Sequence, residues 1–187
     1  MDSNFVLEPG TRGTAAADVF RLEKGRIAEH WDVLQQVPDG TADGHDMFST
    51  VSGPRLPGPD PRASAATTER VGLALFKGLT VDHDPRAYDW YVAATSYEHT
   101  PGIANGRTAV KKYLADLFAD SPDLSAGVKR VVVEGDYVAI HSHYKATPDD
   151  RGTARFDLLR VRNGKVVEHW DVVQPVPETS VNENTMF

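Results

Sequence analysis

The chain contains no cysteine among its 187 residues. This absence excludes disulfides, a thiolate nucleophile and cysteine-based metal centres together. Basic residues form no cluster and the net charge is −7, so the electrostatic footprint of a protein that binds nucleic acid or anionic membrane is missing. No apolar run approaches the ~20 residues of a membrane span, and the N-terminus lacks the basic and apolar regions of a signal peptide. We therefore expect a cytoplasmic protein that binds neither nucleic acid nor membrane.

Several catalytic motifs are also missing. The sequence contains no glycine-rich phosphate loop, no nucleophile elbow and no Ser-His-Asp order. What it does contain is typical of a globular domain, with 40% hydrophobic and 25% charged residues. The length fits one ordinary domain, or one small domain with an appendage.

An internal repeat is the most informative feature of the chain. The phrase "AEHWDVLQQVP" at 28–38 returns as "VEHWDVVQPVP" at 167–177. The longer segments 4–48 and 143–187 align without a gap, and 18 of their 45 positions are identical. A repeat of this length has to be explained by any proposed fold.

A segment rich in proline, glycine and small residues, 49–68, follows the first copy. Such a composition cannot build a core and is typical of a linker. The sequence therefore predicts three parts, which are a partial repeat (1–48), a linker (49–68) and a complete domain (69–187).

Within the complete domain, helical patterns precede strand patterns. Apolar residues keep a helical period over 71–79 and again over 110–118. Between them, Asp84-Pro85 offers a helix start, with proline in the first turn. Alternating apolar residues then predict two hairpins, around Gly135-Asp136 and around Asn163-Gly164. This order indicates an α+β fold with helices packed on one face of a curved antiparallel sheet.

Counting from the turns predicts which residues face one another. A two-residue turn at Asn163-Gly164 places Asp157 opposite Trp170, and symmetric arms around the preceding loop place His143 opposite Asp157. These three residues would form a row on one face. A carboxylate in an apolar cavity is a base with an adjustable pKa, and a facing imidazole can orient it or relay its proton. The alternative is a satisfied Asp–His pair on a solvated face.

Two further interpretations concern the other histidines. His141 and His143 share a strand face, and His99 could join them in a metal site. Because no acidic ligand and no metal-motif spacing accompany them, we expect no metal. His169 falls on the face opposite Trp170, where we expect a packed or surface residue.

Three stretches resemble a known family. These are "YEHTPGIANGRTAVKKYLADLF" (97–118), "GDYVAIHSHY" (135–144) and "DLLRVRNGKVVEHWDVVQPVPETSVNENTMF" (157–187). They are similar to the SnoaL-like family of the NTF2-like superfamily, in the branch of aldol-condensation enzymes and polyketide cyclases. The resemblance covers 69–187 and implies a cone of helices on a curved sheet around a pocket. It also implies a small apolar or carbonyl ligand and no cofactor.

The resemblance assigns roles to individual residues. Asp157 takes the place of the family's catalytic base and His143 that of its helper. The residues then expected to contact the substrate are His99, Trp170, His141 and Tyr97. Glu98 departs from the family pattern, where an amide is more usual, and this puts the polar details of the pocket mouth in doubt.

The reaction implied is removal of an α-proton from a β-dicarbonyl compound by Asp157, followed by intramolecular aldol ring closure. It requires neither a metal nor a Schiff-base lysine. Two other classes stay open, because the same fold hosts many functions. One is a non-catalytic binder that uses the pocket for an apolar ligand. The other is a dimerisation module whose sheet face is buried against a partner.

The first copy carries a hairpin and tail without the helices. It keeps Asp18, which counting places opposite Trp31, and has Asn4 where the second copy has His143. Two strands alone are unstable in water, and their side chains are too apolar to be left in solvent. We therefore expect this hairpin to pack on the complete domain or on a second chain, and we expect the protein to form a homodimer.

Overall fold

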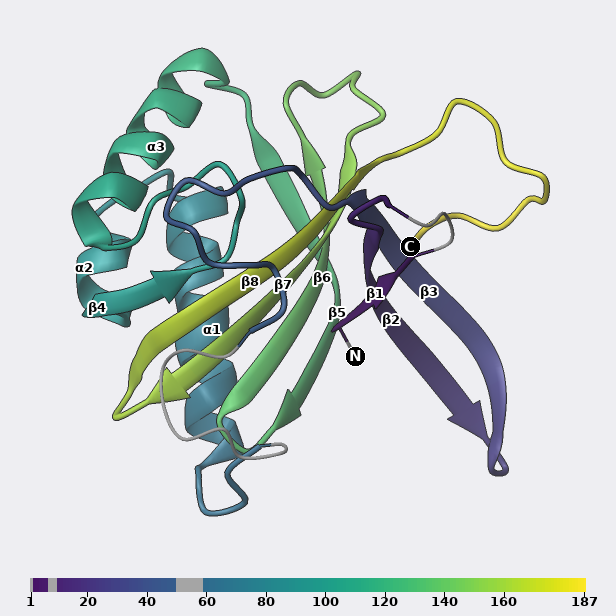
Figure 1. Ribbon diagram of the computed structural model, residues 1–187, viewed down its shortest axis with the longest axis horizontal. Helices are drawn as coiled ribbons and strands as arrows, with labels where there is room; N and C mark the ends of the chain where they lie inside the picture. The colour runs from purple at the N-terminus through teal and green to yellow at the C-terminus, as the bar shows by residue number, and fades with distance from the viewer. Residues whose placement is uncertain (1, 7–9, 50–58) are drawn as a thin grey trace.

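The computed structural model describes residues 2–6, 10–49 and 59–187. Within these ranges the N-terminal part forms a three-stranded antiparallel sheet in the order β1-β2-β3. The strands are β1 (Asp2–Phe5), β2 (Thr14–Glu23) and β3 (Arg26–Gln36). Figure 1 shows β2 and β3 as a long hairpin beside the rest of the molecule.

The remainder forms a five-stranded sheet in the order β4-β8-β7-β6-β5 with three helices. The helices are α1 (Ala65–Thr80), α2 (Ala87–Tyr91) and α3 (Arg107–Asp120). The strands are β4 (Val92–Glu98), β5 (Ser125–Glu134), β6 (Tyr137–Lys145), β7 (Thr153–Arg162) and β8 (Lys165–Pro175). The predicted α+β fold, with helices on a curved sheet, is confirmed.

One strand was not expected. β4 follows α2 directly and pairs with β8 in parallel, whereas the other pairs in the sheet are antiparallel. The sheet is therefore mixed rather than antiparallel throughout. The sequence "VAATSYE" of β4 carries no clear alternation of apolar and polar residues, so it gave no strand signal.

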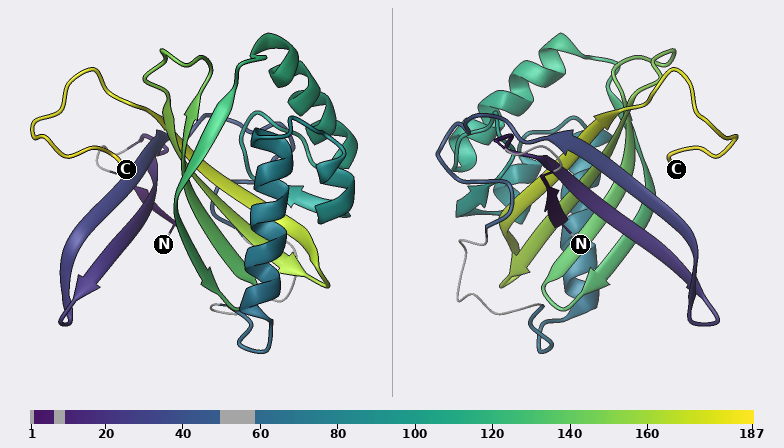
Figure 2. Two further views of the ribbon diagram at one scale, coloured as in Figure 1. Left: turned by 180° about the vertical axis from the view of Figure 1, so that it is seen from behind. Right: turned by 45° about the vertical axis from the view of Figure 1, so that its right-hand side comes forward.

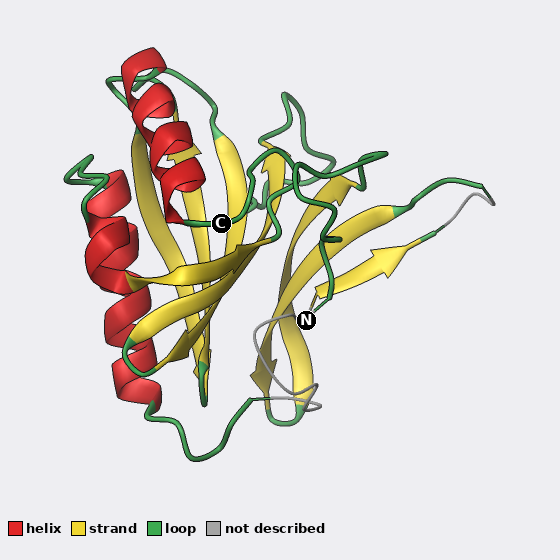
Figure 3. Cartoon of the chain, turned by 60° about the vertical axis from the view of Figure 1, so that its left-hand side comes forward, coloured by secondary structure: helices red, strands yellow, loops and turns green. Residues whose placement is uncertain are grey.

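The molecule has three layers (Figures 2 and 3). The helices cover one face of the five-stranded sheet, and the hairpin packs on the other face at one end and diverges from it towards its turn. The core under the helices is formed by apolar residues from α1, α2, α3 and the sheet, including Val71, Leu75, Val110, Ile140 and Leu159. A second core lies between the two sheets and contains Ala15, Val33, Met47, Ala154, Phe156 and Val172. The hairpin thus packs on the complete domain of its own chain.

Helix α1 begins directly after its N-cap residue, Ser64. The side chain of Ser64 accepts a hydrogen bond from the backbone N–H of Thr67 at 3.3 Å, which satisfies one of the free donors of the first turn. Gly72 lets this helix approach the sheet, because a Cβ there would lie 2.6 Å from Cγ1 of Val138. The helix therefore begins inside the predicted linker 49–68, of which residues 50–58 lie outside the described residues.

No helix in the described part of the chain is long and apolar enough to cross a membrane.

Candidate functional site

A cavity of about 90 Å³ lies between the concave face of the five-stranded sheet and the helices. Its walls are mostly apolar, with Leu75, Phe76, Leu114, Leu117, Ile140 and Leu159 among them. The side chain of Tyr113 on α3 is 41% exposed and also lines it. The volume is well below the ~300–1,000 Å³ of pockets for drug-sized ligands. The pocket therefore fits a small molecule, and a larger ligand requires its walls to move apart.

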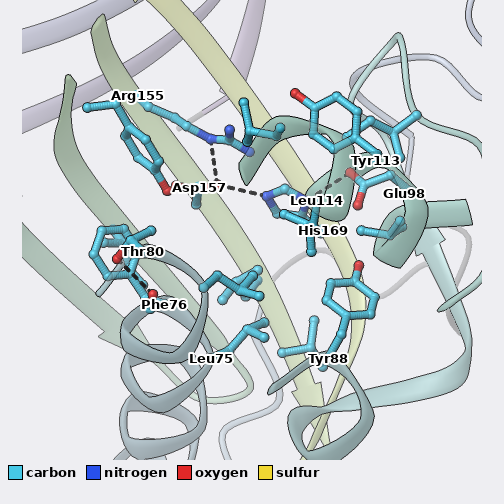
Figure 4. A pocket seen from close by; sticks show the side chains of 18 of the residues that line it. Leu75, Phe76, Thr80, Tyr88, Glu98, Tyr113, Leu114, Arg155, Asp157 and His169 are labelled. Carbon is cyan, nitrogen blue, oxygen red and sulfur yellow. Dashed lines mark hydrogen bonds and ion pairs between the residues drawn. The ribbon is translucent and has the colours of Figure 1, made fainter. Parts of the chain in front are cut away.

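Three titratable side chains form a chain of hydrogen bonds at one end of this pocket (Figure 4). His169 lies in the middle. Its Nε2 is 2.9 Å from Oδ1 of Asp157, and its Nδ1 is 2.8 Å from Oε1 of Glu98. The side chains of all three residues are at least 86% buried. An imidazole held between two carboxylates in this way is bonded through both of its nitrogens.

Arg155 adds a second cation beside this group. Its Nε donates to Oδ1 of Asp157 at 2.9 Å, and its Nη2 forms an ion pair with Oδ2 of Asp171 at 2.8 Å. The hydroxyl of Thr100 lies 2.8 Å from Oε1 of Glu98 and 2.9 Å from Oδ1 of Asp171. The carboxylates are thus linked into one buried network.

The network determines which groups are charged. Burial by itself would lower the pKa of His169, but Glu98 and Asp157 outweigh it and raise the pKa to about 10. Burial would also raise the pKa of Asp157 and of Glu98. The pKa of Asp157 is nevertheless lowered, by Arg155 and then by His169, and that of Glu98 is lowered by His169. At neutral pH the imidazole is therefore protonated and both carboxyls are ionised.

Asp171 behaves differently from its neighbours. Burial raises its pKa above the ordinary value, and the positive charge of Arg155 offsets this only in part. Tyr144 also lines the pocket, and burial followed by the charge of Asp157 raises the pKa of its hydroxyl. This hydroxyl therefore stays neutral and can donate a hydrogen bond.

The two carboxylate oxygens of Asp157 differ in their hydrogen bonds. Oδ1 accepts hydrogen bonds from both His169 and Arg155. Oδ2 is buried, and none of the described residues donates a hydrogen bond to it. A buried acceptor without a donor is costly, and because Asp157 lines the pocket, Oδ2 is the acceptor of this network that is still open to a proton or a hydrogen bond from a ligand.

Strand alternation brings these residues to one face. Arg155 and Asp157 are two residues apart on β7 and point the same way. Asp157 pairs directly with Asp171 on β8, and His169 on β8 pairs with Glu98 on β4. The parallel strand β4, which the sequence pattern did not reveal, therefore supplies the second carboxylate.

The predicted row of His143, Asp157 and Trp170 is wrong. Asp157 faces Ile140 on β6 and Asp171 on β8, while His143 faces Ala154. The first difference comes from the loop before β7, whose arms are not symmetric. The second comes from a bulge at Arg160/Val161, which shifts the register of β8 by one residue. Each shift moves the whole set of side chains to the other face.

His141 and His143 therefore lie on the outer face of the sheet, away from the pocket. The ring of His141 stacks between Phe156 at 4.5 Å and Phe187 at 5.5 Å, and the ring of His143 stacks on Phe187 at 4.2 Å. Burial and then the charge of Arg130 lower the pKa of His141 to about 4. These two histidines hold the second core together rather than line the cavity.

Tyr97, His99 and Trp170 also lie on this outer face. His99 is fully buried, with Nε2 at 2.9 Å from Oε1 of Glu168, and its ring stacks on Trp170 at 5.1 Å. Indole Nε1 of Trp170 donates to the carbonyl of Ser49, and His99 hydrogen-bonds the carbonyl of Asp46. The expected ligand contacts thus hold the tail of the first copy against β4 and β8.

Sequence reasoning missed three pocket residues, Glu98, Arg155 and His169. Glu98 had been noted as a departure from the family pattern, which was the available signal. His169 was expected on the face opposite Trp170, and that part of the prediction is confirmed. Its place on the same face as Asp157 could not be predicted from the sequence, because it depends on the bulge.

Comparisons with known proteins agree with this fold. Residues 74–177 match the family described as SnoaL-like polyketide cyclase. The chain therefore belongs to the SnoaL-like polyketide cyclase family. A search of the curated proteins finds no relative of the chain.

Solved structures support the same architecture. One is a candidate polyketide cyclase from Bacillus cereus, with 20% identity and a TM-score of 0.53 over 64% of this chain and 88% of that one. A candidate ketosteroid isomerase from Kribbella flavida has 16% identity and a TM-score of 0.53 over 64% and 87%. An NTF2-like protein from Mesorhizobium loti has 24% identity and a TM-score of 0.50 over 63% and 97%. These likenesses establish the NTF2-like cone fold alone.

Proposed function

We propose that the pocket catalyses proton abstraction next to a carbonyl group, with Asp157 as the base, and that ring closure by aldol condensation follows. The proposal is carried by Asp157, which lines the pocket and whose buried Oδ2 accepts a hydrogen bond from none of the described residues. Family membership supports the same reaction class.

In the first step, Oδ2 of Asp157 takes a proton from a carbon that lies between two carbonyl groups. The electron pair left on that carbon becomes an enolate. In the second step, the enolate carbon bonds to the carbon of a third carbonyl group elsewhere in the same molecule, and Asp157 returns the proton to the resulting alkoxide. Each proton removed is given back, so the side chains need no other reactant.

The two cations explain how a weak base could serve here. The lowered pKa of Asp157 makes it a poor base for an ordinary C–H bond, so the proposal requires an acidic one. When the proton moves to Asp157, negative charge moves to the substrate and stays near Arg155 and His169. The total charge of the site is unchanged, and fixed cations stabilise the enolate without reorganisation. His169 therefore replaces His143 in the role expected from the sequence.

The walls define the substrate class. Apolar side chains surround most of the cavity, and both cations are already paired with carboxylates. An anionic group such as a phosphate would find no uncommitted cation among these. The pocket thus favours a neutral β-dicarbonyl compound with an apolar body, held close to Asp157 so that proximity adds to acid–base catalysis.

A second candidate function is binding without catalysis. The lowered pKa of Asp157 favours it, since a fully ionised carboxylate paired with two cations is also a stable structural unit. In that case a ligand would donate a hydrogen bond to Oδ2 and leave unchanged.

Deuterium exchange separates the two. We would incubate cyclic and acyclic β-dicarbonyl compounds in D₂O with the wild type and with Asp157→Asn, and follow the α-proton by NMR. We expect exchange that falls about 10²–10⁴-fold in the variant, which is the usual contribution of a positioned base. Asp18→Asn removes the equivalent aspartate of the first copy and is the matched control, in which exchange is retained.

Three results would contradict the proposal. Persisting exchange in Asp157→Asn, with the fold intact by circular dichroism, places the base elsewhere. Ligand-induced shifts in the protein spectrum without exchange favour the binder. Absence of exchange across the whole panel of compounds also counts against catalysis.

A further inference from the structure

The two copies of the repeat share their backbone details. The turn residues Lys24 and Gly25 have φ of 51° and 75°, and Asn163 and Gly164 have 51° and 71°. The bulge of β3 opposite Arg21/Leu22 occurs at the position equivalent to the bulge of β8 opposite Arg160/Val161. The hairpin β2–β3 therefore has the conformation of β7–β8.

The side chains follow the same pattern. In the first copy His30 lies 2.7 Å from Oδ1 of Asp18, and in the second His169 lies 2.9 Å from Oδ1 of Asp157. The shared bulge also corrects the expected pairing of Asp18 with Trp31, since Asp18 faces Asp32. The hairpin thus repeats the aspartate–histidine pair of the pocket without the helices that cover it.

Contacts between the copies are reciprocal. The backbone N–H of Leu34 donates to Oε1 of Gln174 at 2.8 Å. The backbone N–H of Val173 donates to Oε1 of Gln35 at 2.8 Å. Leu34 is equivalent to Val173 and Gln35 to Gln174. A contact that is repeated when the two partners are exchanged is the mark of a two-fold, self-complementary interface, whereas a head-to-tail contact would be made in one direction only.

The core between the sheets obeys the same symmetry. Most of its members fall into equivalent pairs, each with one residue from either copy. The pairs are Ala15 with Ala154, Ala17 with Phe156, Val33 with Val172, Met47 with Met186, and Phe48 with Phe187. The part of the outer face formed by Ala154, Phe156 and Val172 is therefore covered by a surface built from its own sequence.

We propose that the N-terminal sheet and the segment 37–49 occupy the place of a second subunit. The chain then carries its own dimer partner and is monomeric through this face, in contrast to the homodimer expected from the sequence. When the hairpin is displaced, the occupant of the exposed face is the complete domain of a second copy, because that domain presents the same residues in the same two-fold relation. This inference does not depend on the proposed reaction.

Sedimentation tests the proposal on the full chain. We expect sedimentation to give the wild type the mass of a single chain, 20.5 kDa. Val33 is fully buried in the core between the sheets, so Val33→Asp places a carboxylate there and displaces the hairpin. We expect this variant to sediment at twice the chain mass. Leu22→Asp changes a residue of the same hairpin that is 65% exposed, and this control should stay monomeric.

A second pair of substitutions identifies the interface. In the Val33→Asp dimer, Gln174 of each chain accepts one hydrogen bond from the other chain. Gln174→Ala therefore removes two hydrogen bonds and should raise the dimer dissociation constant about tenfold or more. Gln35 lies on the displaced hairpin, so Gln35→Ala should leave it unchanged. In the wild-type background the two substitutions remove equivalent bonds and should lower Tm by the same amount.

Other results would overturn the proposal. A wild-type dimer that Leu22→Asp dissociates would show that the outward face of the hairpin is the pairing surface. A folded monomeric Val33→Asp variant, or equal effects of Gln35→Ala and Gln174→Ala on its dimer, would exclude the two-fold face. If Val33→Asp does not fold, unequal Tm losses for Gln35→Ala and Gln174→Ala in the wild type would exclude it.

Discussion

Replacing His169 by glutamine tests the charge state of the buried network. The imidazole is held between Asp157 and Glu98, and its side chain is 14% exposed. The variant keeps hydrogen-bonding groups but leaves two carboxylates without the cation between them. Arg155 still neutralises the charge of Asp157, so most of the lost stability comes from Glu98, which no longer has a cation beside it.

Two independent arguments give the expected loss of unfolding free energy. Removing one partner of a buried ion pair costs about 3–5 kcal/mol. The difference between the ordinary pKa of 6.5 and the value of about 10 for His169 corresponds to roughly 5 kcal/mol. For a chain of this length a loss of this size lowers Tm by roughly 10 °C.

The pH dependence supplies the sharper test. Because the pKa of His169 is raised on folding, its contribution is complete below pH 6.5 and is lost as the pH rises towards 10. The difference in unfolding free energy between wild type and His169→Gln should therefore shrink between pH 7 and pH 10. Urea unfolding at several pH values in this range measures it.

The chain offers a matched control. His30 is the equivalent residue of the first copy, 2.7 Å from Asp18, but its side chain is 43% exposed. His30→Gln should cost about 1 kcal/mol or less. A difference for His169→Gln that stays constant between pH 7 and pH 10 would refute the reasoning, because it would mean that His169 is not protonated in the folded protein.

Two further predictions concern stability. Asp136 is 1% exposed and accepts from Nε of Arg160 at 2.9 Å, so Asp136→Ala should lower the unfolding free energy by about 3–5 kcal/mol in urea unfolding, and a loss below 1 kcal/mol would contradict the assigned pair. Gly152 and Gly25 both have positive φ, but a Cβ at Gly152 would lie 2.1 Å from the carbonyl oxygen of Tyr144 whereas none of the described atoms lies near one at Gly25. Gly152→Ala should therefore lower Tm clearly more than Gly25→Ala, and equal losses would show that left-handed strain alone decides the effect.

The fold was largely predictable because it depends on local patterns. Helical periodicity and the Asn163-Gly164 turn each act over a few residues, and the repeat is visible by direct comparison of the sequence with itself. They predicted the helices and the two hairpins, and they left open whether the first copy packs on the complete domain or on a second chain. The strand β4 was missed because its pairing with β8 is set by tertiary contacts and not by alternation within "VAATSYE".

The site was less predictable, because it depends on register. Asp157 was placed in the pocket, but a bulge and an asymmetric loop moved His143 and Trp170 to the opposite face. Neither irregularity has a signature in the residues around it. His169 replaced them through a shift of one position, which sequence counting could not detect.

The bulge in β8 has a consequence for how the sequence can change. Val167 is the extra residue opposite Arg160/Val161, and from it onward alternate residues of β8 serve two unrelated tasks. Glu168 and Trp170 hold the hairpin side, while His169 and Asp171 belong to the charged network. Substitutions can alter one task and spare the other, but the loss or gain of a single residue in this strand would exchange both sets of side chains at once. Natural variation in β8 should therefore proceed by replacement, and length changes should be confined to the loops that flank it.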